Sequence, residues 1–379
     1  MKAVVLGVGM VPFRKMPERT LAGVGGDAVI AALRDACLGA TDVEAAYCGN
    51  VLYGGGAGQA VLAGLGITGP PIINVENACA SGGTAFMEAV HAVQSGRVEV
   101  ALAIGVEMLT HAGGGLIVSA RPDISAQVGL PLPGLYALKA QRFLSERGGT
   151  REQLAAVVVK NRQNAVTNEH AYFHSAVTVE EVLASAPVSD PLTLFQCCPN
   201  VDGAAAAVVV SEEFARRHSP EFTIVVAGMG AASGHRIDVQ EELPDITERA
   251  AEMAYEQAGV GPTDIDVCEV HEPFSIAEIL HYESLGFCDP GEGGNYVASG
   301  RASLVGDGVA VNTSGGLIAR GHPLGASGVA QIFEIVTQLR GRAGGRQRAG
   351  ARVGMTHIAG GTIPELDGNA AVVTVLMRQ

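Results

Sequence analysis

The sequence predicts an α/β fold made of two similar three-layered halves packed against each other. The first observation is an internal repeat, in which "AVVLGVG" at 3–9 has a counterpart in "IVVAGMG" at 224–230. The second is that β-branched runs alternate with segments whose apolar residues recur at i, i+3 and i+4, which is typical of strand–helix–strand units on a largely parallel sheet. The third is the composition: 47% hydrophobic residues supply a large core, and 51 glycines allow many close backbone approaches.

Both halves predict the same succession of elements. In the first half we expect, in order, a strand, a helix, a short strand after an acidic turn, a strand, a helix and a strand, at 3–9, 25–40, 42–52, 72–76, 81–96 and 100–107. In the second half the same succession falls at 224–230, 245–260, 264–274, 308–315, 326–341 and 351–361. The repeat places one half at 1–220 and the other at 221–379.

The segment from about 113 to 190 interrupts this regular pattern, and we interpret it as an inserted, partly helical lobe of the first half. Its positive charges stand out in an acidic chain: Lys139, Arg142, Arg147, Arg151, Lys160 and Arg162. Solvated helix faces would explain them, and so would recognition of a phosphorylated ligand.

Composition limits the class of protein. A net charge of −14 disfavours binding to nucleic acid or to an anionic membrane surface, although a local basic patch could still hold a phosphorylated ligand. Seven scattered cysteines without a CxxC pair fit free thiols in a reducing compartment and predict no zinc site. The first residues read as a strand and not as a signal peptide, and no apolar run is long enough for a membrane span. We therefore expect a cytoplasmic protein.

Cys79 is the first candidate for chemistry. In "NACASGGTAF" it follows a predicted strand and precedes a glycine-rich helix start. Unpaired backbone N–H groups at a helix end favour a negative charge, so we expect a reactive thiolate there. Small neighbours let a substrate approach and leave N–H groups free to bind an oxyanion. A buried, inert thiol is the alternative, and we assign the other six cysteines to it.

Two histidines also lie at predicted ends of strands. "VHEPFSIAEI" places His271 where the loops of α/β sheets carry reactive groups, and "NTSGGLIARGHPLGASG" places His322 in a glycine-dense loop before a helix. Each alone could be structural. One cysteine and two histidines at such turns in two similar halves form a plausible acyl-transfer site.

These motifs, with the final "THIAGG", resemble in the same order the four active-site loops of the thiolase superfamily. Segments 136–143, 150–165 and 190–210 resemble the sterol-carrier-protein type and its acetyl-CoA acetyltransferase-like relatives. The resemblance covers essentially the whole chain. It implies the thiolase fold, in which two α/β/α halves form a five-layered αβαβα core with an inserted loop domain, and it implies a homodimer or a dimer of dimers.

The resemblance also implies roles for single residues. Cys79 would take up the acyl group as a thioester, and His322 would deprotonate it. His271 would donate an N–H to the thioester oxygen of the substrate that is activated at its α-carbon. The backbone N–H groups of Cys79 and of a glycine in the last loop, Gly360, would form an oxyanion hole. Coenzyme A thioesters would be substrates, and no permanently bound cofactor or metal is expected.

The chain departs from the family pattern at the second cysteine, which serves as acid and base for the α-proton. Pro273 stands in "HEPF" where the sterol-carrier type has that cysteine, and His357 stands where other thiolases have it. His357 or Glu272 could serve as the base. Ser233, after the first strand of the second half, could line the ligand tunnel, or it could belong to a plain turn.

The function predicted from these residues is a thiolase-like acyl-CoA C-acyltransferase, which joins two acyl groups or cleaves a 3-oxoacyl-CoA. A decarboxylative condensing enzyme of the ketoacyl-synthase type and a non-catalytic acyl-CoA- or lipid-binding subunit are the alternatives. The resemblance also implies a possible partner, a small OB-fold, zinc-ribbon protein that binds acyl-CoA.

Overall fold

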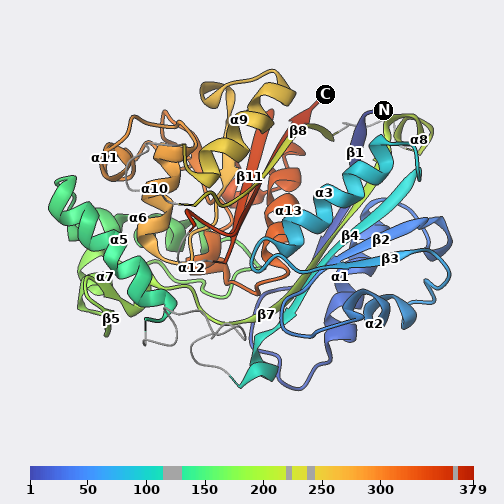
Figure 1. Ribbon diagram of the computed structural model, residues 1–379, viewed down its shortest axis with the longest axis horizontal. Helices are drawn as coiled ribbons and strands as arrows, with labels where there is room; N and C mark the ends of the chain where they lie inside the picture. The colour runs from blue at the N-terminus through green and yellow to red at the C-terminus, as the bar shows by residue number, and fades with distance from the viewer. Residues whose placement is uncertain (114–129, 219–223, 237–243, 362–365) are drawn as a thin grey trace.

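The computed structural model describes residues 1–113, 130–218, 224–236, 244–361 and 366–379. Each half contributes five strands to the main sheet (Figure 1). Those of the first half are β1 (Ala3–Met10), β2 (Ala45–Gly49), β3 (Ile72–Val75), β4 (Val100–Met108) and β7 (Asp202–Ser211). Those of the second half are β8 (Ile224–Ser233), β9 (Val267–Glu269), β10 (Ala310–Val311), β11 (Val353–Gly360) and β12 (Ala370–Arg378).

The strand order repeats between the halves, which confirms the predicted duplication of the fold. It runs β3-β2-β4-β7-β1 in the first half and β10-β9-β11-β12-β8 in the second. The two sets are joined only where β1 pairs with β8, at Val4–Val225 and Val5–Ile224. Elsewhere they lie on opposite sides of two central helices, α3 (Ser81–Gln94) and α13 (Ser327–Leu339), which contact strands of both halves.

The prediction of a largely parallel sheet was wrong, because the sheet of the structure is mixed. Strand β7 runs antiparallel to β4 and β1, and β12 runs antiparallel to β11 and β8. A parallel crossover needs a dozen or more residues. The link between β11 and β12 is shorter than that, so β12 must turn back along β11.

Helices complete the five layers. The outer layer of the first half holds α1 (Leu21–Asp35) and α2 (Ala57–Ala63), and that of the second half holds α9 (Ile246–Ala258) and α10 (Ser275–Ser284). The repeated glycines explain how α1 and α9 pack. A Cβ on Gly9 would lie 2.4 Å from the carbonyl oxygen of Ala28 in α1, and a Cβ on Gly230 would lie 2.0 Å from that of Ala250 in α9.

The remaining described elements surround the second half or lie at the edge of the first. The lobe holds α5 (Leu132–Glu146), α6 (Arg151–Ala165), α7 (Val179–Ala184), β5 (Pro187–Ser189) and β6 (Leu192–Thr193). Outside it lie α8 (Glu212–His218), α11 (Gly293–Ala298) and α12 (Gly316–Arg320). The part of the lobe at 114–129 lies outside the described residues. No described helix combines the length and the apolar character that crossing a membrane requires.

The two central helices begin beside each other, and glycine makes this contact possible. A Cβ on Gly328 would lie 2.4 Å from the backbone nitrogen of Gly83, and one on Gly82 would lie 2.5 Å from the carbonyl oxygen of Gly325. Real Cβ atoms do not tolerate such distances to backbone atoms. The first turns of α3 and α13 are therefore held in direct backbone contact.

We expect Gly328→Ala to lower the free energy of unfolding by about 1–3 kcal/mol, because the added methyl group overpacks a backbone contact. The better helix propensity of alanine, worth about 1 kcal/mol, offsets only part of this loss. Guanidinium denaturation measures the change. Gly64→Ala is the matched control: its Cβ would lie 4.0 Å from the nearest atom, and its effect should stay within about 0.5 kcal/mol. Equal stability of both variants would contradict the backbone contact.

Candidate active site

Cys79 lies in the turn between β3 and α3. The preceding residue, Ala78, has a φ of 48°, a left-handed conformation that residues with side chains rarely adopt. Ser81 holds this turn, because its Oγ donates to the carbonyl oxygen of Ala78 at 2.6 Å and accepts from the backbone N–H of Asn77 at 2.8 Å. The strained turn leaves the thiol half-buried at the first turn of the central helix.

The thiol of Cys79 is neutral at rest. Burial raises its pKa to about 12, although its own backbone N–H and that of Gly361 lower it. Desolvation thus outweighs the stabilisation that the N–H donors give to a thiolate at this helix end. Cys79 needs a base that takes its proton when it reacts.

His322 has the geometry of such a base. Its Nδ1 lies 2.8 Å from the Oγ of Ser327, whose hydroxyl donates to the carbonyl oxygen of Pro323 at 2.9 Å. A hydroxyl has one proton, so Ser327 must accept from His322, and the ring proton lies on Nδ1. Nε2 is then a free lone pair, and it has no hydrogen-bond partner among the described residues. Burial lowers the pKa of His322 to about 3, so the ring is neutral.

His271 follows β9, and its ring is buried with neither nitrogen hydrogen-bonded to a described residue. Burial, followed by the neighbouring His322 and His357, lowers its pKa well below the ordinary value, so this ring is also neutral. A buried polar group without a partner carries a free-energy cost. One nitrogen of neutral His271 carries a proton and can donate it to a ligand oxygen.

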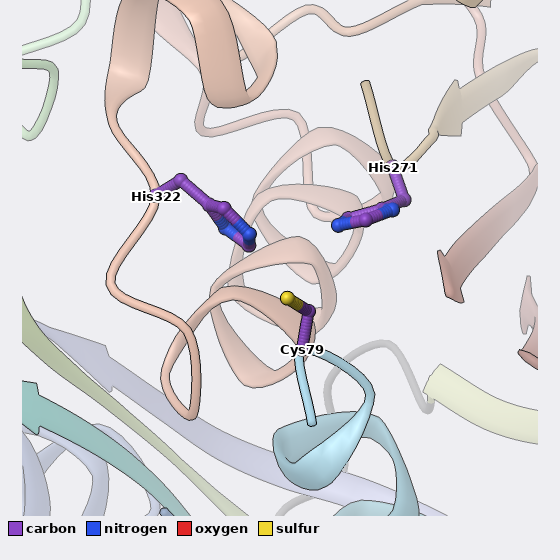
Figure 2. Close-up of side chains that lie close together, drawn as sticks. All are labelled: Cys79, His271 and His322. Carbon is purple, nitrogen blue, oxygen red and sulfur yellow. The ribbon is translucent and has the colours of Figure 1, made fainter. Parts of the chain in front are cut away.

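The structure brings Cys79, His271 and His322 together. The sulfur and one nitrogen of each ring lie within 4.8 Å of one another, and the two ring centroids are 5.2 Å apart. Figure 2 shows the three side chains pointing toward one space from three separate segments of chain. A nucleophile, a base and a neutral N–H donor at this spacing can perform acyl transfer. The same three groups could also hold a divalent metal ion, which the spacing along the sequence does not predict.

The last loop brings Gly360 and Gly361 to the Cys79 turn. Gly360 pairs with Ala370 in the sheet, and its own close contact is with the Cys79 turn: a Cβ there would lie 2.2 Å from the carbonyl oxygen of Asn77. The backbone N–H that lowers the pKa of Cys79 belongs to Gly361, whose φ of 70° suits glycine. Gly361 is therefore a second candidate donor in this loop, and the oxyanion role expected of Gly360 stays a prediction.

His357 does not face Cys79. Its Nε2 lies 3.1 Å from the Oγ1 of Thr247, and its Nδ1 accepts the backbone N–H of His271 at 3.5 Å. Burial lowers its pKa well below the ordinary value. Both ring nitrogens are therefore engaged. The ring supports the backbone of His271 and does not reach the space between Cys79, His271 and His322.

Glu272 is fully buried and points into a polar cluster. Its Oε1 accepts from the side-chain amide of Asn161 at 3.2 Å and from the backbone N–H of Ile318 at 3.1 Å, while its Oε2 has no hydrogen-bond partner among the described residues. Burial and then the charge of Glu278 raise its pKa well above the ordinary value. The raised pKa favours the neutral acid over the carboxylate, which disfavours this group as a base at rest.

Ser233 is the last residue of β8 and not part of a plain turn. It is exposed and pairs with Ala370, the residue of β12 that also faces Gly360. Its carbonyl oxygen accepts from Arg249 at 2.9 Å. Ser233 thus lies across a strand from the last loop, outside the group formed by Cys79, His271 and His322.

The positive charges of the lobe are mostly engaged within the protein. Four pair with carboxylates: Arg142 with Glu146, Arg147 with Glu283, Arg151 with Asp190, and Lys160 with buried Glu278. The guanidinium of Arg162 lies 3.9 Å from the ring centroid of Phe173, and the ammonium of Lys139 lies 5.2 Å from that of Tyr136. These contacts favour a structural role for most of the six.

Sequence reasoning missed Ser327, Gly361, Tyr136 and Cys198 at this site. Ser327 has a local signal, because it starts a helix five residues after His322. Cys198 was assigned to inert packing, yet it is half-buried, and the charge of Cys79 is among the causes that raise its pKa. Burial, then the charges of Cys79 and Cys198, raise the pKa of Tyr136.

Two family models match this chain: the thiolase N-terminal domain at residues 3–213 and the thiolase C-terminal domain-like family at 231–377. Together with the fold and the cysteine–histidine site, they define the class: the chain belongs to the thiolase family. The resemblance carried by the four motifs is thereby confirmed.

Similar proteins narrow the class to acyltransferases. The benzoylsuccinyl-CoA thiolase subunit BbsB of Thauera aromatica is 44% identical over 85% of each chain, and an acetyl-CoA acetyltransferase of Methanothermobacter thermautotrophicus is 40% identical over 99% of each. Rat sterol carrier protein 2 is 37% identical over 98% of this chain and 71% of its own length. The solved Ltp2-ChsH2(DUF35) aldolase matches with a TM-score of 0.86 and 25% identity over 98% of this chain and 97% of that one. This chain is an acyltransferase of the thiolase type.

Proposed function

We propose that this enzyme transfers an acyl group from coenzyme A to Cys79 and then to the α-carbon of a second acyl-CoA, or runs these steps in reverse. The observation that carries the proposal is the convergence of Cys79, His271 and His322 within 4.8 Å, with Nε2 of His322 free to accept a proton. Acyl-CoA is the substrate in both half-reactions, and the chain's own side chains supply the chemistry.

In the first half-reaction, Nε2 of His322 takes the proton of Cys79 as the sulfur attacks the thioester carbonyl. The backbone N–H groups of Cys79 and Gly361 would hold the resulting oxyanion, a role supported by their lowering of the pKa of the Cys79 thiol. One preorganised donor of this kind is worth about 3–4 kcal/mol in related acyl-transfer sites. The intermediate collapses as the coenzyme A thiolate leaves, and Cys79 carries the acyl group.

In the second half-reaction, a base in the site takes the α-proton of the second acyl-CoA, which becomes an enolate. The neutral ring of His271 supports a role as donor to the enolate oxygen, because it has a proton to give and no other partner among the described residues. The enolate carbon attacks the acyl group on Cys79, the thiolate of Cys79 leaves, and it regains its proton from His322.

Intact-mass spectrometry after exposure to acetyl-CoA or propionyl-CoA tests the proposal. We expect the mass to rise by one acyl group on Cys79, and hydroxylamine, which cleaves thioesters, to reverse the rise. Protein that stays unmodified with every short and aromatic acyl-CoA would refute an acyl-enzyme and favour a binding subunit.

Turnover of malonyl-CoA distinguishes the decarboxylative alternative. Two neutral, buried imidazoles beside one thiol are also compatible with enolate formation by loss of carbon dioxide. Carbon dioxide release and condensation from malonyl-CoA, without condensation of acetyl-CoA, would favour that reaction. The name of the Thauera relative extends the candidate substrates to aromatic 3-oxoacyl-CoA thioesters.

The assembly and the location of this protein are also proposals. A dimer is supported by β3, which lies at the end of the strand order with Ile73 exposed, and by the exposed Leu52 and Tyr53 in the segment after β2. A small OB-fold, zinc-ribbon partner is supported by the match to the Ltp2-ChsH2(DUF35) aldolase, whose name includes a second component, ChsH2(DUF35). Placement in the cytoplasm stays a prediction from the free thiols and the acidic composition.

A further inference from the structure

The "HEPF" motif lacks the second cysteine, but Cys198, from another segment of the chain, lies beside it. The backbone N–H of Cys198 donates to the carbonyl oxygen of Pro273 at 2.9 Å, and Cys197 pairs with Phe274 as an antiparallel bridge. The loop before β7 therefore runs alongside the loop that carries His271. Cys198 lies beside Pro273, whose side chain can neither donate nor accept a proton.

The neighbours of Cys198 are those of the reaction site. Burial, then the charges of Cys197, Cys79 and Glu272, raise the pKa of Cys198. The ring of Tyr136 stacks on that of Phe274, the residue after Pro273, with a centroid distance of 4.6 Å. Cys197 is different, because its thiol donates to the carbonyl oxygen of Thr193 at 3.4 Å.

An independent observation indicates that a polar ligand belongs in this space. The ring of His271 is 4% exposed, and neither of its nitrogens has a partner among the described residues. In Figure 2 this ring faces Cys79. A thioester oxygen would provide the missing partner, and its α-carbon would then lie in the space that Cys79, His271 and their neighbours surround.

Other candidates for the α-proton are engaged elsewhere. Both nitrogens of His357 are hydrogen-bonded away from Cys79, and His322 already serves that sulfur. Glu272 keeps one free oxygen, Oε2, but its other oxygen is anchored by Asn161 and Ile318. Among the residues that the structure describes, Glu272 is therefore the competitor against which Cys198 must be tested.

Building on the proposed function, we propose that Cys198 is the acid and base for the substrate's α-proton. When Cys79 is acylated, the thiol of Cys198 gives its proton to the departing coenzyme A thiolate. The resulting Cys198 thiolate takes a proton from the α-carbon of the second acyl-CoA: a C–H bond breaks, an S–H bond forms, and the electron pair moves into the enolate. After condensation, Cys79 recovers its proton from His322, and Cys198 is again a thiol. Cleavage runs the same steps backward.

Deuterium exchange separates this role from acylation. The full-length protein is incubated with acetyl-CoA in D₂O, and mass spectrometry follows both deuterium in the acetyl group and acetylation of Cys79. We expect Cys198→Ala to slow exchange about 100-fold or more, the range of general acid–base catalysis. Cys79 should still become acetylated, although more slowly, because the departing coenzyme A thiolate then lacks its proton donor. Cys198→Ser, which keeps the volume but has a far less acidic group, should lose exchange likewise. Cys197→Ala is the matched control and should exchange at the wild-type rate.

Three results would overturn the assignment. Exchange by Cys198→Ala at the wild-type rate refutes it directly, while the acyl-enzyme proposal survives. Loss of exchange in Glu272→Gln with retention in Cys198→Ala assigns the proton to Glu272 instead. Failure of wild-type protein to acetylate Cys79 refutes the proposed function itself, and this inference falls with it. Acetylation of Cys79 in each variant shows that the variant is folded.

Discussion

Replacing Cys79 with alanine or serine is expected to lower the rate of acyl transfer by about 10⁴-fold or more, as for other covalent nucleophiles. Alanine removes the atom that carries the acyl group. Serine keeps the shape, but its hydroxyl is far less acidic, and a histidine whose pKa burial lowers to about 3 is too weak a base to deprotonate it. Condensation, thiolysis and the mass increase with acetyl-CoA measure the loss.

Cys288→Ala provides the control for the loss of a thiol as such. Cys288 is half-buried and lines a separate surface pocket with Tyr296 and Arg301. Its replacement should leave acyl transfer within about twofold of the wild type, as expected for a change away from the site. An acylated Cys79→Ala protein would place the acyl group on another residue and contradict the assigned nucleophile.

Removing the imidazole of His322 by His322→Ala is expected to slow acylation of Cys79 about 10³-fold, within the range of general base catalysis. The loss should extend to alkylation of Cys79 by iodoacetamide, because the thiol, whose pKa burial raises to about 12, then has no base beside it. Ser327→Ala should have a smaller effect of about 10-fold, since it removes only the acceptor of the Nδ1 proton and leaves a buried N–H unpaired.

The pH dependence of alkylation gives a second readout. The pKa of His322 is lowered to about 3, so its Nε2 is already unprotonated well below neutral pH. The wild-type rate should therefore show no inflection near pH 6.5, where an ordinary histidine titrates. In His322→Ala the rate should rise with pH, because only the small thiolate fraction reacts. An unchanged rate in the variant would exclude His322 as the base, and an inflection near pH 6.5 in the wild type would contradict the lowered pKa of its ring.

The general fold could be predicted from the sequence because its signals are local. Glycines such as Gly9 and Gly230 mark where a strand meets a helix backbone, and apolar spacing marks the buried faces. The direction of β7 and β12 could not be predicted, because it depends on how the chain returns to the sheet and not on side-chain periodicity. The division of the chain at about residue 220 stays a prediction.

The candidate site could be predicted where sequence motifs mark its residues. Cys79, His271 and His322 were named from their positions at strand–helix turns, and the structure brings them together. The direction in which a side chain points was harder to predict. His357 faces Thr247, and Gly360 pairs with Ala370 at the end of β11, a placement that the sequence motif did not predict. Cys198 reaches Pro273 only through folding of the lobe, which no local pattern records.

The start of α3 and the start of α13 carry the same triplet, Ala80–Ser81–Gly82 and Ala326–Ser327–Gly328. In the first copy the serine fixes the turn that exposes the nucleophile, and in the second it fixes the proton on the base. One duplicated helix start has thus acquired two complementary tasks, one in each half. The glycines of both copies hold the helix starts in contact, so the separation between the Cys79 sulfur and the His322 imidazole depends on how the duplicated halves join. Neither half alone contains a complete set of the proposed reacting groups.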